Sequence, residues 1–145
     1  MRVFFDASVI IASLLSPTGG SSLLFRYVKT GQFTGIISQT VIGEITAKKK
    51  SKKIKKTKTE IEEWIAGSGL IVRKSITTAE IKIYQDMIDT DDAHLVAGAR
   101  LTHCSRLVTL DKKHLLNTDI TQRFLPIRIV SPKELLQEII KIKHC

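Results

Sequence analysis

Four acidic residues lie at points where the expected structure changes from a strand to a loop or a helix: Asp6, Glu44, Asp92 and Asp111. In a parallel α/β sheet, the carboxyl ends of neighbouring strands face one crevice, and ligands bind there. Carboxylates that converge without basic partners repel one another, and a divalent cation would neutralise them. Hard oxygen ligands suit Mg²⁺ or Mn²⁺. The sequence therefore predicts an acidic site for one of these cations.

The segments that must position these acids alternate between strands and helices. Short apolar runs predict five strands, at residues 2–5, 33–37, 70–72, 106–109 and 127–130. Helical patterns predict helices over 9–15, around 23–28, around 41–45, over 59–66, from Thr78 to about 88, over 93–101 and after the capping box of Ser131 and Glu134. This alternation predicts an α/β fold, a three-layer sandwich around a mostly parallel five-stranded sheet.

Length and composition are those of one soluble domain. The 145 residues, 43% of them apolar, fit a single domain over 1–145 with a substantial core. No apolar run reaches membrane-spanning length, and the start is typical of a strand rather than of a signal peptide. We therefore expect a cytoplasmic protein with no membrane partner.

The net charge of +9 is concentrated in one segment, residues 48–58. This lysine-rich segment has no acid and holds eight of the 23 basic residues, which leaves 15 against 14 acidic residues elsewhere. The lysines are Lys48, Lys49, Lys50, Lys52, Lys53, Lys55, Lys56 and Lys58. Such a run is usually a solvated loop or a frayed helix, but beside a nucleic-acid-cutting site it would contact phosphates.

The two cysteines do not indicate a structural site. Cys104 and Cys145 each follow a histidine, but neither pair has the spacing of a zinc site. A domain of this size also does not need a disulfide. We therefore expect neither zinc nor a disulfide here.

Several motifs together resemble the PIN domain family, in particular the stand-alone prokaryotic PIN proteins that are toxins of toxin–antitoxin pairs. The matching stretches are FFDASVII at 4–11, LLSPTG at 14–19, IIS at 36–38 leading to Glu44, DTDDAH at 89–94, LVTLD at 107–111 and IVSPKEL at 129–135. Each stretch alone is common, but they follow the family's order over nearly the whole chain.

The resemblance implies a metal-dependent endoribonuclease that cuts single-stranded or loop regions of RNA and leaves a 5′-phosphate. It also implies a small antitoxin protein as a partner and a homodimer. By position, Asp6, Glu44, Asp92 and Asp111 would be the catalytic acids, and Ser8 and Thr109 would be auxiliary hydroxyl residues. Hydrolysis of a phosphodiester needs a cation that lowers the pKa of water and offsets developing negative charge, which agrees with this assignment.

The roles of the acids differ. We expect Asp6, Asp92 and Asp111 to bind the metal directly, and Glu44 to position a second metal or the attacking water. The adjacent Asp91 leaves the third acid ambiguous by one position. We favour Asp92 because it directly precedes the helix over 93–101, as the family's acid does.

Simpler interpretations exist for each residue. Asp6, Asp91 or Asp92 could cap a helix, and Glu44 could be a solvated helix residue. Thr109 could be an ordinary strand residue. We expect His94 and His114 to be structural, and Trp64 and Tyr84 to belong to the core rather than to stack on bases.

Other α/β functions conflict with particular residues. A phosphatase of the Asp-x-Asp type needs an acid where Ser8 stands, and a receiver domain needs a lysine where Ser131 and Pro132 follow the fifth strand. No glycine-rich phosphate loop follows the first strand. Two alternatives to a toxin stay open: a nuclease-silent RNA-binding or scaffold protein, and a housekeeping RNA-processing nuclease.

Overall fold

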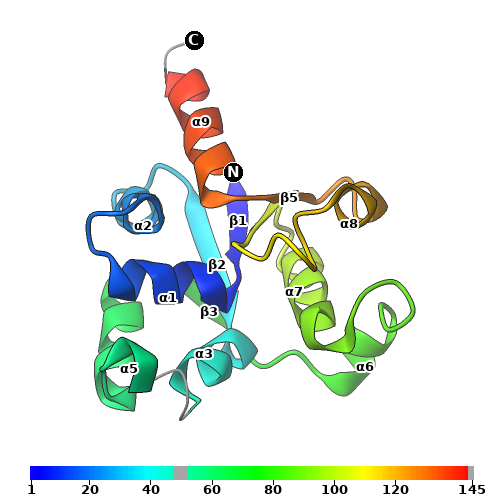
Figure 1. Cartoon of the computed structure of the whole chain (residues 1–145), viewed down its shortest axis with the longest axis horizontal. Helices are drawn as coiled ribbons and strands as arrows, with labels where there is room; N and C mark the ends of the chain where they lie inside the picture. Colours follow the sequence, from blue (N-terminus) through cyan, green and yellow to red (C-terminus); the bar gives the residue numbers. More distant parts are fainter. Residues whose placement is uncertain (48–51, 144–145) are drawn as a thin grey trace.

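Five parallel strands form one twisted sheet at the centre of the computed structural model, which describes residues 1–47 and 52–143 (Figure 1). The strands are β1 (Arg2–Phe5), β2 (Thr34–Ser38), β3 (Ile71–Arg73), β4 (Arg106–Val108) and β5 (Arg128–Val130). Their order is β3-β2-β1-β4-β5, and every neighbouring pair is parallel. The predicted α/β fold is confirmed, with a sheet that is parallel throughout.

The helices cover both faces of this sheet. Their bounds are α1 (Ala7–Leu15), α2 (Gly20–Lys29), α3 (Gln39–Thr46), α5 (Lys58–Gly67), α6 (Thr78–Lys82), α7 (Thr90–Leu101), α8 (Thr118–Arg123) and α9 (Pro132–Lys143). Helices α1, α2, α3 and α5 lie on one side of the sheet, and α6, α7 and α8 lie on the other (Figure 1). The strand order reverses between β1 and β4, so a crevice is expected beyond the carboxyl ends of these two strands.

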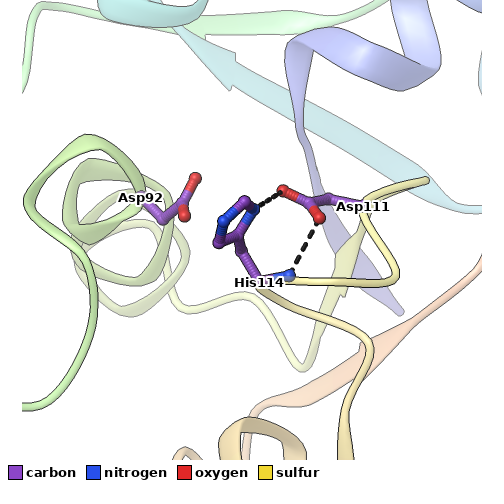
Figure 2. Close-up of side chains that lie close together, drawn as sticks. All are labelled: Asp92, Asp111 and His114. Atoms are coloured by element: carbon purple, nitrogen blue, oxygen red, sulfur yellow. Dashed lines mark hydrogen bonds and ion pairs between the residues drawn. The ribbon is translucent and has the colours of Figure 1, made fainter.

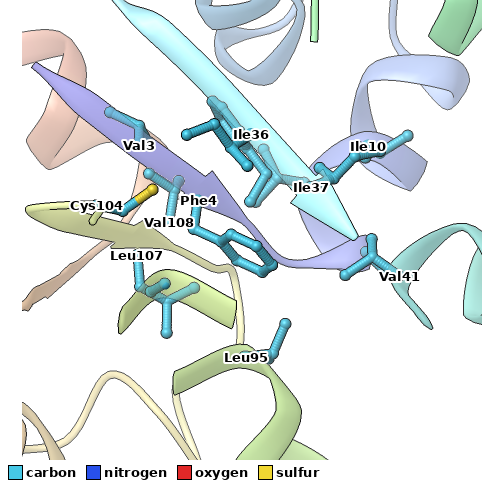
Figure 3. Packing of buried hydrophobic residues seen from close by; sticks show 14 of the residues in the cluster. Val3, Phe4, Ile10, Ile36, Ile37, Val41, Leu95, Cys104, Leu107 and Val108 are labelled. Atoms are coloured by element: carbon cyan, nitrogen blue, oxygen red, sulfur yellow. The ribbon is translucent and has the colours of Figure 1, made fainter. Parts of the chain in front are cut away.

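Adjacent phenylalanines on β1 anchor the two helical layers. The Phe5 ring lies 4.8 Å from the Phe25 ring of α2, centroid to centroid. Phe4 lies on the opposite face, where a Cβ atom added to Gly98 of α7 would come within 2.5 Å of its ring. Figure 3 shows Phe4 and Leu107 on the side of the sheet that faces α7. Residue 98 must therefore be glycine for α7 to pack this closely on β1.

Most predicted elements are present, with ends that differ by up to three residues. The helix expected from Thr78 to about 88 is much shorter, because α6 ends at Lys82 and turns follow it. Its cap is Thr77, one residue earlier than expected, in a reciprocal pair with Glu80. The capping box of Ser131 and Glu134 is confirmed by two hydrogen bonds of 3.1 Å.

Among the described helices, α8 was not expected from the sequence. Helix α8 begins after Asn117, whose side chain accepts a hydrogen bond from the Ile120 backbone N–H at 3.0 Å.

Trp64 packs edge-on against Phe25, with ring centroids 5.2 Å apart, and Tyr84 packs against Phe124. Both aromatic side chains therefore take part in core packing, as predicted.

Within the described residues, no single helix is long and apolar enough to span a membrane. Helices α1 and α2 would pass such a test only as a joined pair, and they are bent by 104° relative to each other. Cys104 is a free, buried thiol that follows α7, while Cys145 lies outside the described residues.

Candidate active site

Asp6 lies at the carboxyl end of β1, where its carboxylate is held by two hydroxyl groups. Its Oδ2 atom accepts hydrogen bonds from Ser8 Oγ at 2.9 Å and from Thr109 Oγ1 at 2.8 Å. Although Asp6 occupies the N-cap position of α1, its side chain makes no capping hydrogen bond. The interpretation of Asp6 as a side-chain cap is therefore wrong.

The two hydroxyl residues tie Asp6 to the loop that leads to Asp111. Ser8 Oγ accepts a hydrogen bond from the Leu110 backbone N–H, and Thr109 Oγ1 accepts one from the Asp111 backbone N–H, both at 3.1 Å. Thr109 is fully buried. Each hydroxyl has one proton and gives it to Asp6, so this carboxylate acts as a double acceptor. Thr109 is therefore more than an ordinary strand residue.

Asp92 lies in the first turn of α7 and points toward Asp111 and His114 (Figure 2). The pKa of Asp92 is raised to about 6, mostly by burial and then by the negative charges of Asp111, Asp6 and Asp89, against a smaller opposing effect of His114. Three carboxylates from separate elements, Asp6, Asp92 and Asp111, therefore lie close enough to repel one another.

The neighbouring acids of α7 have different surroundings. Asp89 is the N-cap, and its side chain accepts a hydrogen bond from the Asp91 backbone N–H at 3.0 Å. Asp91 is exposed, whereas Asp92 is partly buried. The capping role that the sequence allowed for Asp91 or Asp92 belongs to Asp89.

Asp111 is held by the turn that follows it. Its Oδ1 atom accepts hydrogen bonds from the Lys113 and His114 backbone N–H groups, at 3.1 and 2.9 Å. Its Oδ2 atom lies 3.1 Å from His114 Nδ1. Burial raises the pKa of Asp111, but the hydrogen bonds and the charge of His114 outweigh it, so the pKa is below its ordinary value.

His114 lies beside the acids, whereas the sequence predicts only a structural role for it. Potential ligand atoms of Asp92, Asp111 and His114 all lie within 4.8 Å of one another. Among the residues that the structure describes, this is the group of acids, histidines and cysteines close enough to hold a metal ion. The i, i+3 spacing of Asp111 and His114 just after a strand was the signal in the sequence.

Asp6 and Glu44 lie outside that group, and only Asp6 is near enough to Asp92 to raise its pKa, whereas Glu44 makes a different contact. It lies on α3, and its Oε1 atom is 2.9 Å from Nε2 of His94, which lies on α7 two residues after Asp92. The structure thus brings Asp6, Asp92 and Asp111 together and pairs Glu44 with the second histidine.

A family model identifies the family to which this chain belongs. The family model described as PIN domain matches residues 2–113, which include all four predicted acids. The chain belongs to the PIN domain family. The resemblance predicted from the ordered motifs is therefore confirmed.

A solved structure with the same fold is that of VapBC2 from Rickettsia felis, bound to a DNA fragment from its promoter. The similarity covers 90% of this PIN domain and 98% of the VapBC2 chain, with a TM-score of 0.58 and 15% sequence identity. At this identity, the comparison establishes the fold. No curated protein matches the chain.

In this PIN domain, three of the described lysines of the 48–58 segment line three different cavities. Lys53 lines a cavity of about 350 Å³ together with Ser8, Ile11, Ala12 and Leu15. Lys56 and Lys58 line two others, beside Trp64 and beside Gln39 respectively. Only the first cavity shares a residue, Ser8, with the hydrogen bonds around Asp6. Lys48, Lys49 and Lys50 lie outside the described residues.

Proposed function

We propose that this PIN domain is a Mg²⁺- or Mn²⁺-dependent endoribonuclease of the cytoplasm. The observation that supports it most is the convergence of Asp6, Asp92 and Asp111 at the reversal of strand order, with His114 beside them. Nuclease activity is also what membership of the family leads us to expect. We propose one domain over residues 1–145, with the lysine-rich segment as part of its RNA-binding surface.

The side chains fit a hard divalent cation. Asp92 and Asp111 would hold it, with Asp6 approaching from β1, because carboxylate oxygens are the donors that Mg²⁺ and Mn²⁺ prefer. Burial and the negative charges of Asp111 and Asp6 raise the pKa of Asp92, and a bound cation would offset these charges. When bound, the cation supplies Lewis acidity toward phosphate oxygens and lowers the pKa of water.

The chain's own residues orient these donors. Ser8 and Thr109 fix the Asp6 carboxylate, and the turn after Asp111 fixes both oxygens of that side chain. His114 Nδ1 contacts Asp111 Oδ2, in the manner of an outer partner that orients a metal ligand. The exposed side of the His114 ring faces the solvent from which RNA would approach.

The cavity beside Ser8 provides a path for the RNA strand. Its walls are apolar at Ile11, Ala12 and the half-exposed Leu15, and Lys53 adds a positive charge. A nucleotide lying there would place its base against the apolar wall and its phosphate near Lys53. Ser8 joins this cavity to Asp6, because it lines the cavity and its hydroxyl donates a hydrogen bond to the Asp6 carboxylate.

We expect Lys53→Gln to weaken RNA binding more than Lys58→Gln does. Lys53 lines the cavity next to the acids, while Lys58 lines one formed by α3, α5 and β3. Loss of one phosphate contact should lower the slope of log affinity against log salt by roughly 0.7 for single strands. Titrations of a single-stranded RNA over a range of KCl, in EDTA to prevent cleavage, measure this. Equal effects of the two variants would mean that binding is spread over the whole segment.

We propose further that the protein is a toxin with a small antitoxin partner and that it forms a homodimer. The shared fold with VapBC2, a toxin–antitoxin complex, supports an antitoxin partner. Co-expression with a small adjacent reading frame should relieve growth arrest caused by this chain. Growth that is unaffected with or without such a partner would favour a housekeeping nuclease.

The decisive test of the enzymatic proposal is incubation of structured RNAs with the purified protein in Mn²⁺ and in EDTA. Cleavage products with 5′-phosphate ends in Mn²⁺ alone are the expected result. RNA binding without cleavage in millimolar Mn²⁺ or Mg²⁺ would instead identify a nuclease-silent RNA-binding protein.

A further inference from the structure

The contact between Glu44 and His94 joins two elements that lie on different faces of the sheet. Glu44 lies on α3, and His94 lies on α7, with Oε1 and Nε2 separated by 2.9 Å. The His94 side chain is 7% exposed, while that of Glu44 is 38% exposed. A buried histidine thus meets a carboxylate that is partly open to solvent.

The environment of Glu44 differs from that of a solvated helix residue. Its Oε1 atom is buried and makes no regular hydrogen bond within the described part of the chain, and it lies 2.9 Å from His94 Nε2. The exposed area of the side chain therefore belongs to its other atoms, including Oε2. One carboxylate oxygen is held against the histidine ring, and the rest of the group faces outward.

His94 is suited to fix this carboxylate because its own position is rigid. Its helix is capped by Asp89 and packs on β1 through Gly98, and the flanking Ala93 and Leu95 are buried. The His94 Nδ1 atom is also buried without a hydrogen-bond partner among the described residues. Because a buried, unsatisfied nitrogen is costly, core packing alone does not account for a histidine at this position, and its close polar contact among the described residues is with Glu44.

We propose that His94 is a positioning residue that holds Glu44 against α7, the helix that carries Asp92. This inference rests on the proposed nuclease function and assigns a role to a side chain outside the acidic group. The contact fixes Glu44 relative to Asp92, although these two acids come from separate elements, α3 and α7. Without it, the Glu44 carboxylate would sample other side-chain rotamers in solvent.

A double-mutant cycle tests this role. His94→Phe keeps an aromatic ring but removes the nitrogen, and Glu44→Gln keeps the shape of the side chain but removes its charge. Each single variant should lower kcat for RNA cleavage by about 10–100-fold, the usual cost of losing an outer partner, with little change in KM. The double variant should be no slower than Glu44→Gln alone, because His94 acts only through Glu44.

Two more measurements separate positioning from a merely structural role. His94→Phe should change the Mn²⁺ concentration needed for half-maximal thermal stabilisation in the same direction and degree as Glu44→Gln does. His94→Gln, which keeps an N–H group at a similar reach, should restore most of the lost kcat. Thermal melting in EDTA reports whether each variant is folded.

The outcomes distinguish this inference from the proposed function. If the wild type cleaves RNA and His94→Phe lowers kcat by the same factor with Glu44 present or replaced, the positioning role is overturned. It is also overturned if folded His94→Phe is fully active. A wild type that does not cleave RNA, or an Asp92→Asn variant that still does, would overturn the nuclease proposal itself.

Discussion

We expect Asp92→Asn to abolish RNA cleavage and Asp91→Asn to retain most of it. We expect a loss of more than about 100-fold in kcat for Asp92→Asn, since loss of a direct ligand should exceed the 10–100-fold typical of outer partners. The reason is position: Asp92 faces Asp111 and His114 (Figure 2), whereas the side chain of Asp91 is exposed. Cleavage rates at saturating Mn²⁺ and RNA measure both effects.

Asp91→Asn is the matched control for this comparison. Both variants remove one negative charge from the first turn of α7, where acids favour the positive end of the helix dipole. A general effect on the helix or on net charge would therefore appear in both. A greater loss for Asp91→Asn would show that the third acid is misassigned by one residue.

The second expected result is a reversal of stability between the wild type and Asp92→Asn. In EDTA at pH 7, Asp92→Asn should melt at a higher temperature than the wild type, because it relieves repulsion with Asp111 and Asp6. In millimolar Mn²⁺ the order should reverse, since the cation binds only the folded wild-type site. A Mn²⁺ concentration of 100 times Kd adds about 2.7 kcal/mol to the free energy of unfolding. This raises the melting temperature by about 5–10 °C for a chain of this size.

The pH dependence of this difference follows from the direction of the pKa shift. Folding raises the pKa of Asp92 from 3.8 to about 6, so the folded chain binds this proton more tightly than the unfolded chain does. The stabilisation from the protonated group is complete below about pH 4 and is lost as the pH rises through about 6. In EDTA, the advantage of Asp92→Asn should therefore be largest near neutral pH and disappear near pH 4.

Melting curves in EDTA and in Mn²⁺ over this pH range measure both effects. Asp92 is a better choice than Asp6 for this experiment, because Asp6 also accepts two hydroxyl hydrogen bonds that asparagine would disturb. A wild type that is not stabilised by millimolar Mn²⁺ would mean that the acids do not form a divalent-metal site. The nuclease-silent interpretation would then be preferred.

The sequence predicted the strands and their parallel arrangement well because buried parallel strands are short, apolar and bounded by turn residues. The first strand, for example, has the bounds expected, and the second is displaced by one residue. Strand ends depend on which residues of the neighbouring strand are available for pairing. Helix α8 was missed because it has six residues, too few for a helical pattern of apolar residues to be recognisable.

Only the tertiary structure shows which of the adjacent acids, Asp91 or Asp92, faces Asp111. One position along a helix turns a side chain by about 100°, so Asp91 and Asp92 point in different directions. Which of them faces the acids depends on where α7 begins, and Asp89 decides this by capping the helix. It also depends on the docking of α7 on β1, through Gly98 against Phe4.

The sequence by itself determined the family and the fold, because these follow from the order of local patterns. Only the tertiary structure showed that His114 lies with Asp92 and Asp111, that Glu44 is paired with His94, and that Lys53 lines the cavity at Ser8. The last two contacts join residues separated by about 50 positions in the chain, and no local pattern encodes such a distance. They arise because parallel strands bring the ends of separate segments to one edge of the sheet.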